Sequence, residues 1–349
     1  MNTTTIRTAF KHGRLLITRT NVAVAGAALF VGLSVNQMAL QNDTPAPVLV
    51  HVPSAKTHLT PAAPVATATL TEAKAVPTQS IVATDGDCLA VPSACGYPDE
   101  TNTGVPRGAT LTPSGSITVN PKSATATTVI ENMDIKGSVS VKKGTVIIRN
   151  TRIDNSGETG NKVAAIRLYD GTSAVIEDST IDGGNATVAI VYGNYTLTRV
   201  NLKGGSDALR ADGNVTVTDS YIHDLNRQPE SHNDIIQTLA GKNITFTHNT
   251  LMAFTSASGE GDPMNAVYQF GNFTGNVENV LFENNLVNGG NYTFNANWKS
   301  VDAGKWNVSN VRIINNKFGR DFRYGPAAHI DHGMQFDGNT YVDNNSAVN

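Results

Sequence analysis

Two aspartates that open similar apolar phrases are the side chains best suited to chemistry. Asp207 begins DALRA (207–211) and Asp234 begins DIIQT (234–238). Two carboxylates flanking a sugar bond can act as acid and base in glycoside hydrolysis, with retention at a separation of about 5 Å and inversion at about 6.5–9.5 Å. An aspartate at the start of a strand can instead accept backbone N–H groups and cap a turn. Both interpretations are open.

Cationic and imidazole side chains accompany the two aspartates. Arg210 and Gln237 each follow an Asp by three residues, and His223 and His232 lie in the stretch between them. Histidine can donate or accept a proton near neutral pH, and an arginine supplies a fixed positive charge. We therefore expect a catalytic cluster made of Asp207, Asp234, Arg210, His232 and His223.

Eight copies of one short phrase indicate the architecture that positions these residues. Each copy is an alternating apolar run that leads into Asn, Asp or Ser and then into another apolar residue. The copies are VIENMDI (129–135), VIIRNTRI (146–153), AVIEDSTI (174–181), YTLTRVNL (195–202), VTVTDSYI (215–222), ITFTHNTL (244–251), VLFENNLV (280–287) and VRIINNKF (311–318). A repeat of roughly 20–30 residues is typical of a solenoid, and period-two alternation indicates strands. The predicted fold is all-β: a parallel β-helix of about eight coils.

A second, shorter phrase follows most copies of the first, so each coil is expected to have a longer strand, a polar corner and a second short strand. The apolar residues of this second strand should stack inward, namely Ile166, Leu209, Ile236, Val267 and Phe294. The residues after them should form an outward ladder, spaced by about 4.8 Å, that binds substrate. These residues are Arg167, Arg210, Gln237, Tyr268 and Asn295.

Variable insertions lie between the first phrase and the second. Repeats stacked in register place such insertions on one side, often the binding side. The longest, 223–233 and 252–264, should wall a groove beside the outward ladder. Trp298 and Lys299, in the stretch NWKSVDAGKW, are further candidates for binding a sugar ring. The tryptophan could equally pack on the end of the solenoid.

Asn249, Asn285 and Asn316 recur at one position of the first phrase. Stacked amides that bond to one another along the solenoid are the expected explanation.

The N-terminal part of the chain has the composition of an exported protein. Basic residues precede the apolar run 22–35, which predicts a signal peptide or signal anchor over 1–39. A Pro-, Ala- and Thr-rich linker follows over 40–84, and the β-helix domain should occupy 85–349. Cys88 and Cys95, the only cysteines, are expected to form a disulfide that staples the first coil. The protein should be secreted, and it contacts a membrane only if the N-terminal segment is kept.

Composition narrows the class of partner. The net charge is −3 and charged residues make up 16% of the chain. No basic stripe is present, which argues against a nucleic-acid partner. A polar surface with little charge suits a polysaccharide.

Four segments carry a resemblance to a known superfamily. CGYPDETNTGVP (95–106), the coil repeats, SHNDIIQ (231–237) and RYGPA (323–327) resemble secreted right-handed parallel β-helix proteins of the pectate-lyase-like superfamily, in particular actinobacterial and phage-associated members. The resemblance covers about 85–349. It implies a right-handed β-helix and a carbohydrate-related role, since the superfamily includes lyases, hydrolases, tailspikes and adhesins.

The family comparison does not select one reaction. Asp207 and Asp234 match the position of polygalacturonase-like carboxylates on adjacent coils, but the Asn-Thr-Asp and Asp-Asp motifs of those enzymes are missing. A lyase would use Arg210 or Lys299 as base beside Ca²⁺, and no acidic cluster sufficient for calcium is visible. We expect cleavage of an extracellular or cell-surface polysaccharide by a hydrolase or lyase. The alternatives are a non-catalytic glycan-binding adhesin or tailspike-like protein and a purely structural coil.

Overall fold

The computed structural model describes residues 88–157, 163–227, 231–254, 264–271, 274–297, 305–330 and 333–349. The expected signal segment and linker, together with Trp298 and Lys299, lie outside these residues.

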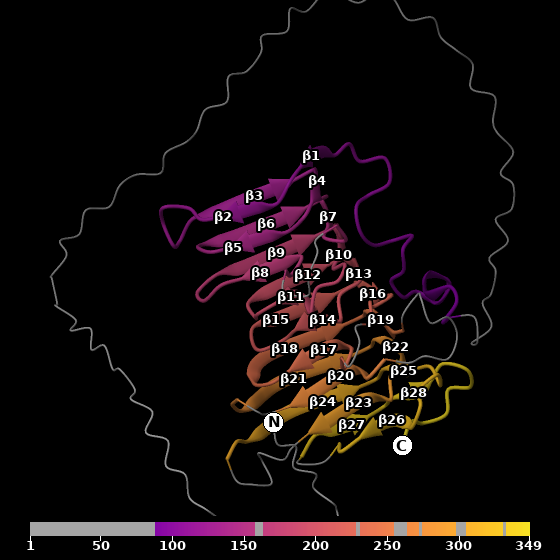
Figure 1. Cartoon of the computed structure of the whole chain (residues 1–349). Coiled ribbons are helices and arrows are strands. Elements are labelled where there is room, and N and C mark those ends of the chain that lie inside the picture. Colours follow the sequence, from indigo (N-terminus) through magenta and orange to yellow (C-terminus); the bar gives the residue numbers. More distant parts are fainter. Residues whose placement is uncertain are drawn as a thin grey trace, which may run out of the picture. The chain divides into compact units, whose positions relative to one another are not determined.

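Each coil contributes one strand to each of three parallel sheets (Figure 1). Sheet 1 contains β1 (Thr112–Ser114), β4 (Met133–Lys136), β7 (Arg152–Asp154), β10 (Thr180–Asp182), β13 (Asn201–Lys203), β16 (Tyr221–His223), β19 (Thr250–Ala253), β22 (Leu286–Gly289), β25 (Lys317–Phe318) and β28 (Thr340–Tyr341). Sheet 2 contains β2 (Ile117–Val119), β5 (Val139–Val141), β8 (Ile166–Leu168), β11 (Val188–Val191), β14 (Asp207–Arg210), β17 (Asp234–Thr238), β20 (Ala266–Gly271), β23 (Tyr292–Asn297) and β26 (Gly325–Ala328). Sheet 3 contains β3 (Thr127–Glu131), β6 (Thr145–Arg149), β9 (Ser173–Glu177), β12 (Tyr195–Thr198), β15 (Val215–Thr218), β18 (Gly241–Thr247), β21 (Val277–Glu283), β24 (Val308–Ile314) and β27 (Gln335–Asp337).

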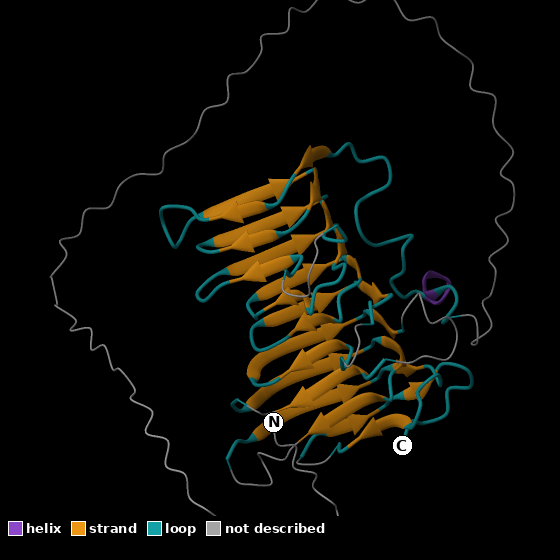
Figure 2. Cartoon of the chain, viewed as in Figure 1, coloured by secondary structure: helices purple, strands orange, loops and turns teal. Residues whose placement is uncertain are grey.

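The predicted fold is confirmed: the chain is a right-handed parallel β-helix. Its described part holds ten strands in sheet 1 and nine in each of the other two, which is slightly more than the eight coils expected. Figure 2 shows that loops join strands at the corners of the stack. The variable insertions begin after strands of sheet 1 and end before strands of sheet 2. Much of the two predicted groove walls, namely residues 228–230 and 255–263, lies outside the described residues.

The internal build of a coil differs from the prediction. Each first phrase spans two strands instead of one long strand, because the chain bends between sheet 3 and sheet 1 at a single residue. In one coil this residue is Asn150, whose φ of 47° is left-handed. Asparagine and aspartate tolerate this conformation better than most residues, which explains their place at the corner in six of the eight copies; Arg199 and His248 occupy it in the other two.

The predicted asparagine ladder is confirmed and is one residue longer than expected. The Nδ2 of Asn249 donates to the Oδ1 of Asn285 at 2.9 Å, and that of Asn285 to Asn316 at 3.1 Å. The Nδ2 of Asn316 donates in turn to Asn339 at 2.9 Å. All four side chains are buried. They satisfy one another and backbone carbonyls inside the corner, as buried polar groups must.

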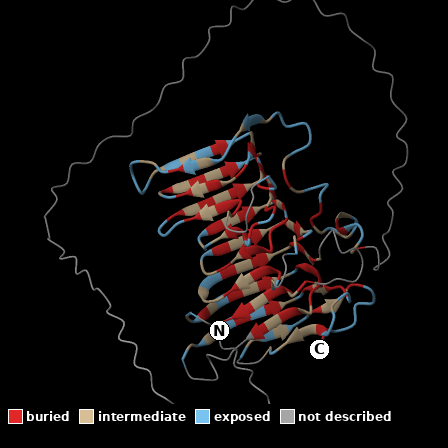
Figure 3. Cartoon of the chain, in the orientation of Figure 1, coloured by how far each residue is buried: buried red, intermediate tan, exposed pale blue. Residues whose placement is uncertain are grey.

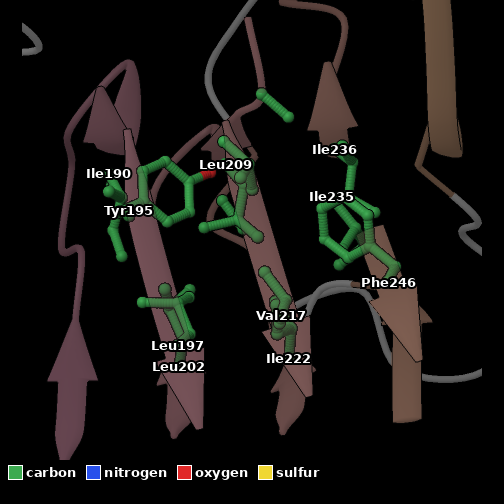
Figure 4. Packing of buried hydrophobic residues seen from close by; sticks show 14 of the residues in the cluster. Ile190, Tyr195, Leu197, Leu202, Leu209, Val217, Ile222, Ile235, Ile236 and Phe246 are labelled. Carbon is green, nitrogen blue, oxygen red and sulfur yellow. The ribbon is translucent and has the colours of Figure 1, made fainter. Parts of the chain in front are cut away.

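The core fills the interior of the solenoid. Buried and less buried residues alternate along the strands (Figure 3), as a sheet with one covered face requires. Figure 4 shows apolar side chains from neighbouring coils, such as Leu197, Leu209 and Ile236, gathered in one cluster. Ile166, Leu209, Ile236 and Phe294 stack in register as predicted.

The prediction for Val267 and Tyr268 was wrong by one residue. Tyr268, expected in the outward ladder, pairs with Ile236 and Phe294 and is fully buried. Its ring stacks on Phe270 with centroids 3.7 Å apart, and its hydroxyl lies 3.0 Å from Oγ1 of Thr238. Since side chains alternate with a period of two, a one-residue slip exchanges the faces. Tyr268 therefore cannot bind substrate in this conformation.

The disulfide between Cys88 and Cys95 is confirmed, but its expected place is wrong. The cysteines belong to an N-terminal strap, residues 88–107, which contains the short 3₁₀ helix η1 (Pro92–Cys95). Cys88 packs with Leu286 and Val342, far along the stack from the first coil. The strap then runs back along sheet 1, where the N–H of Gly104 donates to the Arg199 carbonyl at 2.9 Å. Figure 2 shows η1 beside the stack, well separated from β1 at its end.

Candidate functional site

A row of hydrogen-bonding side chains follows the outer face of sheet 2. Register pairs Arg210 with Gln237, Gln237 with Gln269, and Gln269 with Asn295. Arg167 stands two coils earlier, and Val191 interrupts the row between the two arginines. We call Arg167, Arg210, Gln237, Gln269 and Asn295 the outer row. All five are half-buried, so each keeps part of its polar end at the surface.

Hydrogen bonds tie the later part of the outer row together. The Nδ2 of Asn295 donates to Oε1 of Gln269 at 3.0 Å, and Asn265 donates to the same oxygen at 3.3 Å. Gln237 donates to Oδ2 of Asp234 at 3.3 Å. Sequence reasoning missed Gln269 because of the register slip at Tyr268. It missed Asn265, which precedes the strand and aligns with Asn233 and Asn291 of the neighbouring coils, a recurrence of Asn that the sequence could have revealed.

Asp207 and Asp234 occupy the same register position on the neighbouring strands β14 and β17, since Leu209 pairs with Ile236. Oδ1 of Asp207 accepts the backbone N–H of Asp234 at 3.0 Å. Oδ1 of Asp234 accepts the Nδ2 of Asn265 at 2.7 Å. Asp207 is 5% exposed and Asp234 is fully buried. The two residues are therefore adjacent, and hydrogen bonds within the protein hold both carboxyls.

Burial dominates the electrostatics of the pair. It raises the pKa of Asp207 to about 7, against the smaller opposing effects of the Asp234 N–H and the Arg210 charge. Burial also raises the pKa of Asp234 well above its ordinary value, and the neighbouring Asp207 charge raises it further. The pKa of Asp207 therefore lies near neutral pH, and the pKa of Asp234 is shifted upward in the same direction. A pair of this kind can exchange a proton, but its burial separates it from any ligand on the surface.

The structure places His223 on a different sheet from the carboxyl pair. His223 lies on β16 of sheet 1, where its ring stacks on Tyr221 with centroids 3.9 Å apart. Its Nδ1 is 2.9 Å from Asp224 and its Nε2 is 3.1 Å from Asn201. His232 precedes β17 and is exposed. Their catalytic roles stay predictions.

Arg210 is the member of the predicted cluster that acts on both carboxyls. Its positive charge lowers the pKa of Asp207 and that of Asp234. Arg210 lies beside Gln237 in the outer row. It is therefore a residue of the outer face whose charge also acts on the buried carboxyl pair.

The described ranges contain no cluster of acidic side chains that could bind calcium. These residues contain no group of three or more His, Cys, Asp or Glu side chains able to hold a metal ion. Within the same residues, no helix is long and apolar enough to cross a membrane.

No family model, curated protein or solved structure matches the chain.

Proposed function

We propose that this protein is a secreted polysaccharide-binding member of the pectate-lyase-like superfamily and that an extended glycan lies along the outer row. The observation that supports the proposal is the register itself. Amide and guanidinium groups repeat on one face at the sheet spacing of about 4.8 Å, along the axis of the solenoid. A polymer with regularly repeated hydroxyl or carboxyl groups can bond to several members of such a row at once.

The charge of the outer row favours an acidic glycan. Arg167 and Arg210 are cationic, and the other members of the outer row, Gln237, Gln269 and Asn295, are neutral amides, so the row itself carries positive charge and no carboxylate. Guanidinium groups bind carboxylates through paired, charge-assisted hydrogen bonds. We therefore propose a uronate-containing polysaccharide as the ligand. The disulfide supports export, because such bonds persist in oxidising compartments.

Substitution of Arg210 tests this proposal. We expect Arg210→Gln to weaken binding of an oligogalacturonate by about tenfold or more, the loss expected for one charge-assisted contact. Titration calorimetry measures the effect. The matched control is Arg312→Gln, since Arg312 is exposed on sheet 3 and should leave binding unchanged. Equal affinities of Arg210→Gln and the unmodified protein, or no binding of any acidic glycan, would refute the assignment.

Cleavage by a hydrolase or lyase is the second candidate. One observation favours it: Asp207 titrates at about 7 beside a second carboxyl, the range in which a general acid or base works best at neutral pH. Binding has more support because the described structure seals both carboxyls from the surface.

Release of reducing ends and absorbance of unsaturated products, measured across an acidic glycan panel, separate the two functions. An enzyme should lose this signal when Asp207→Asn and Asp234→Asn are combined. A protein that only binds should show no signal in any form, while the unmodified protein still retains the glycan.

A further inference from the structure

An open groove lies at the turn between sheet 2 and sheet 3, beside the ends of the strands that carry the outer row, and its lining contains no member of the outer row or of the carboxyl pair. Its volume is about 640 Å³, and its lining includes Tyr169, Tyr192, Asn194, Asp212, Lys242 and Glu278. These residues come from successive coils, so the groove follows the axis of the stack. A second hollow of about 430 Å³ shares Gly171, Asn194 and Asn214 with it and extends the groove toward β9 and β12.

Glycines at the base of the groove let the backbones of neighbouring coils approach one another closely. A Cβ added at Gly193 would lie 2.5 Å from the carbonyl oxygen of Gly213, and one at Gly241 would collide with the Asp212 backbone. Only glycine allows the coils to approach this closely. The floor therefore consists of bare backbone, above which longer side chains stand as walls.

Two tyrosines form the aromatic part of the wall. Tyr169 is 44% exposed and Tyr192 is 49% exposed, and they follow the paired strands β8 and β11. Tyr192 also has a φ of 74°, a left-handed conformation that is unfavourable for a bulky residue. Neither burial nor backbone preference accounts for a tyrosine here, and strained residues of this kind cluster at ligand sites.

The rest of the groove lining consists of amide side chains and of charged residues, of which more are acidic than basic. The Nδ2 of Asn214 donates to Oδ1 of Asn194 at 2.8 Å, which begins an exposed row of amides beside the tyrosines. The lining carries Asp170, Asp212 and Glu278 against the single cation Lys242. Its carboxylates would repel an acidic polymer. The groove thus differs in charge from the arginine-containing outer row.

We propose that this groove is a separate site that binds neutral pyranose rings, stacked on Tyr169 and Tyr192 with their hydroxyls bonded to the neighbouring amides and carboxylates. The site adjoins the outer row but uses different residues, and it differs from the row in charge preference. Only the general ligand class, a glycan, rests on the function proposed above.

An array of neutral and acidic glycans probed with the full chain tests the proposal. At least one neutral glycan should be retained, and the double variant Tyr169→Ala/Tyr192→Ala should weaken its binding by about tenfold or more, as expected for loss of aromatic contacts. Tyr169→Phe should bind nearly as well as the unmodified protein because the ring is kept. Tyr324→Ala is the matched control, since Tyr324 is 65% exposed and lies outside the groove.

The outcomes separate this site from the outer row. Arg210→Gln should leave the neutral glycan bound, and the tyrosine double variant should leave an acidic glycan bound. If no neutral glycan binds, or if the double variant retains it as well as the Tyr324→Ala control does, the groove is not a glycan site. Failure of acidic binding alone would overturn only the outer-row proposal.

Discussion

Burial decides the chemistry of single residues in this protein. Asp207 and Asp234 were the strongest catalytic candidates in the sequence, and the fold places them on adjacent coils. Asp207 accepts the backbone N–H of Asp234, and Asp234 accepts the side-chain amide of Asn265, so these bonds join neighbouring coils and differ from the turn-capping bonds that the sequence left open. Hydrogen bonding therefore accounts for their position without a substrate.

The raised pKa of Asp207 predicts a pH-dependent stability. Its folded pKa of about 7 lies above that of an unfolded aspartate, about 3.9, so between these pH values the folded state holds the proton more tightly. The contribution of Asp207 to the free energy of unfolding is full below about pH 4 and is lost as pH rises through 7. We expect the urea midpoint of the unmodified protein to fall over this range relative to that of Asp207→Asn.

Asp207→Asn is a suitable comparison because its amide oxygen can still accept the Asp234 N–H. Asp234, whose pKa is also raised, adds to the same trend in both proteins. Midpoints that run parallel from pH 4 to pH 8 would contradict the assignment of a buried, titrating Asp207.

At the scale of elements, the periodic features were predictable and the non-periodic ones were not. The strands repeat in every coil and the asparagine ladder in four successive coils, so alternation and spacing in the sequence reveal both. The sequence could not show that Tyr268, and not Val267, faces into the solenoid, because both residues are apolar and alternation alone does not distinguish them. Arg199 and His248 adopt the left-handed corner conformation without being residues that favour it.

The strap shows a further limit of sequence reasoning. Its contacts join positions far apart in the chain, such as Tyr97 with His248, whose rings lie 5.6 Å apart. The strap has no repeat that could reveal its path. Leu286, on the outer side of sheet 1, supplies the apolar surface on which the disulfide rests.

The contacts of the strap predict which strands lose local stability when the disulfide is removed. Cys88→Ser/Cys95→Ser removes the closure of a short loop, worth about 2.5 kcal/mol in the chain-entropy model. Since Cys88 packs on Leu286, amide hydrogen exchange should accelerate in β19 and β22. Exchange in β4 and β7 is the internal control and should stay unchanged. Acceleration confined to the first coils would instead support a staple at the start of the solenoid.

At the scale of the whole molecule, stability depends on contacts between neighbouring coils. Each coil contacts mainly the coils before and after it, so the free energy of the stack is close to a sum of coil and interface terms. The buried asparagine ladder adds a polar component to four successive coils, from Asn249 to Asn339. Loss of one member should therefore weaken two interfaces at once.

Asn285 is the member whose loss is best defined. Its Oδ1 accepts both the backbone N–H and the Nδ2 of Asn249, each at 2.9 Å, and its Nδ2 donates to the Phe246 carbonyl at 3.0 Å. Asn285→Ala removes the acceptor of the buried Asn249 N–H and the donor to the Phe246 carbonyl, while the Nδ2 of Asn249 keeps its bond to the Val217 carbonyl at 2.9 Å; each buried group left unpaired costs about 1–3 kcal/mol. We expect a loss of about 3 kcal/mol or more in the free energy of unfolding, measured by urea denaturation, with faster hydrogen exchange in the coils on both sides.

Asn243→Gly provides the matched control from the exposed amide row. The Nδ2 of Asn243 donates to Asn214 at 3.0 Å, but the residue is exposed, so water can replace the lost bonds. Glycine also accepts its left-handed φ of 59°. This variant should change stability by no more than about 0.5 kcal/mol. Similar losses in the two variants would mean that burial of the ladder contributes nothing beyond its hydrogen bonds, and the interface account of this solenoid would be wrong.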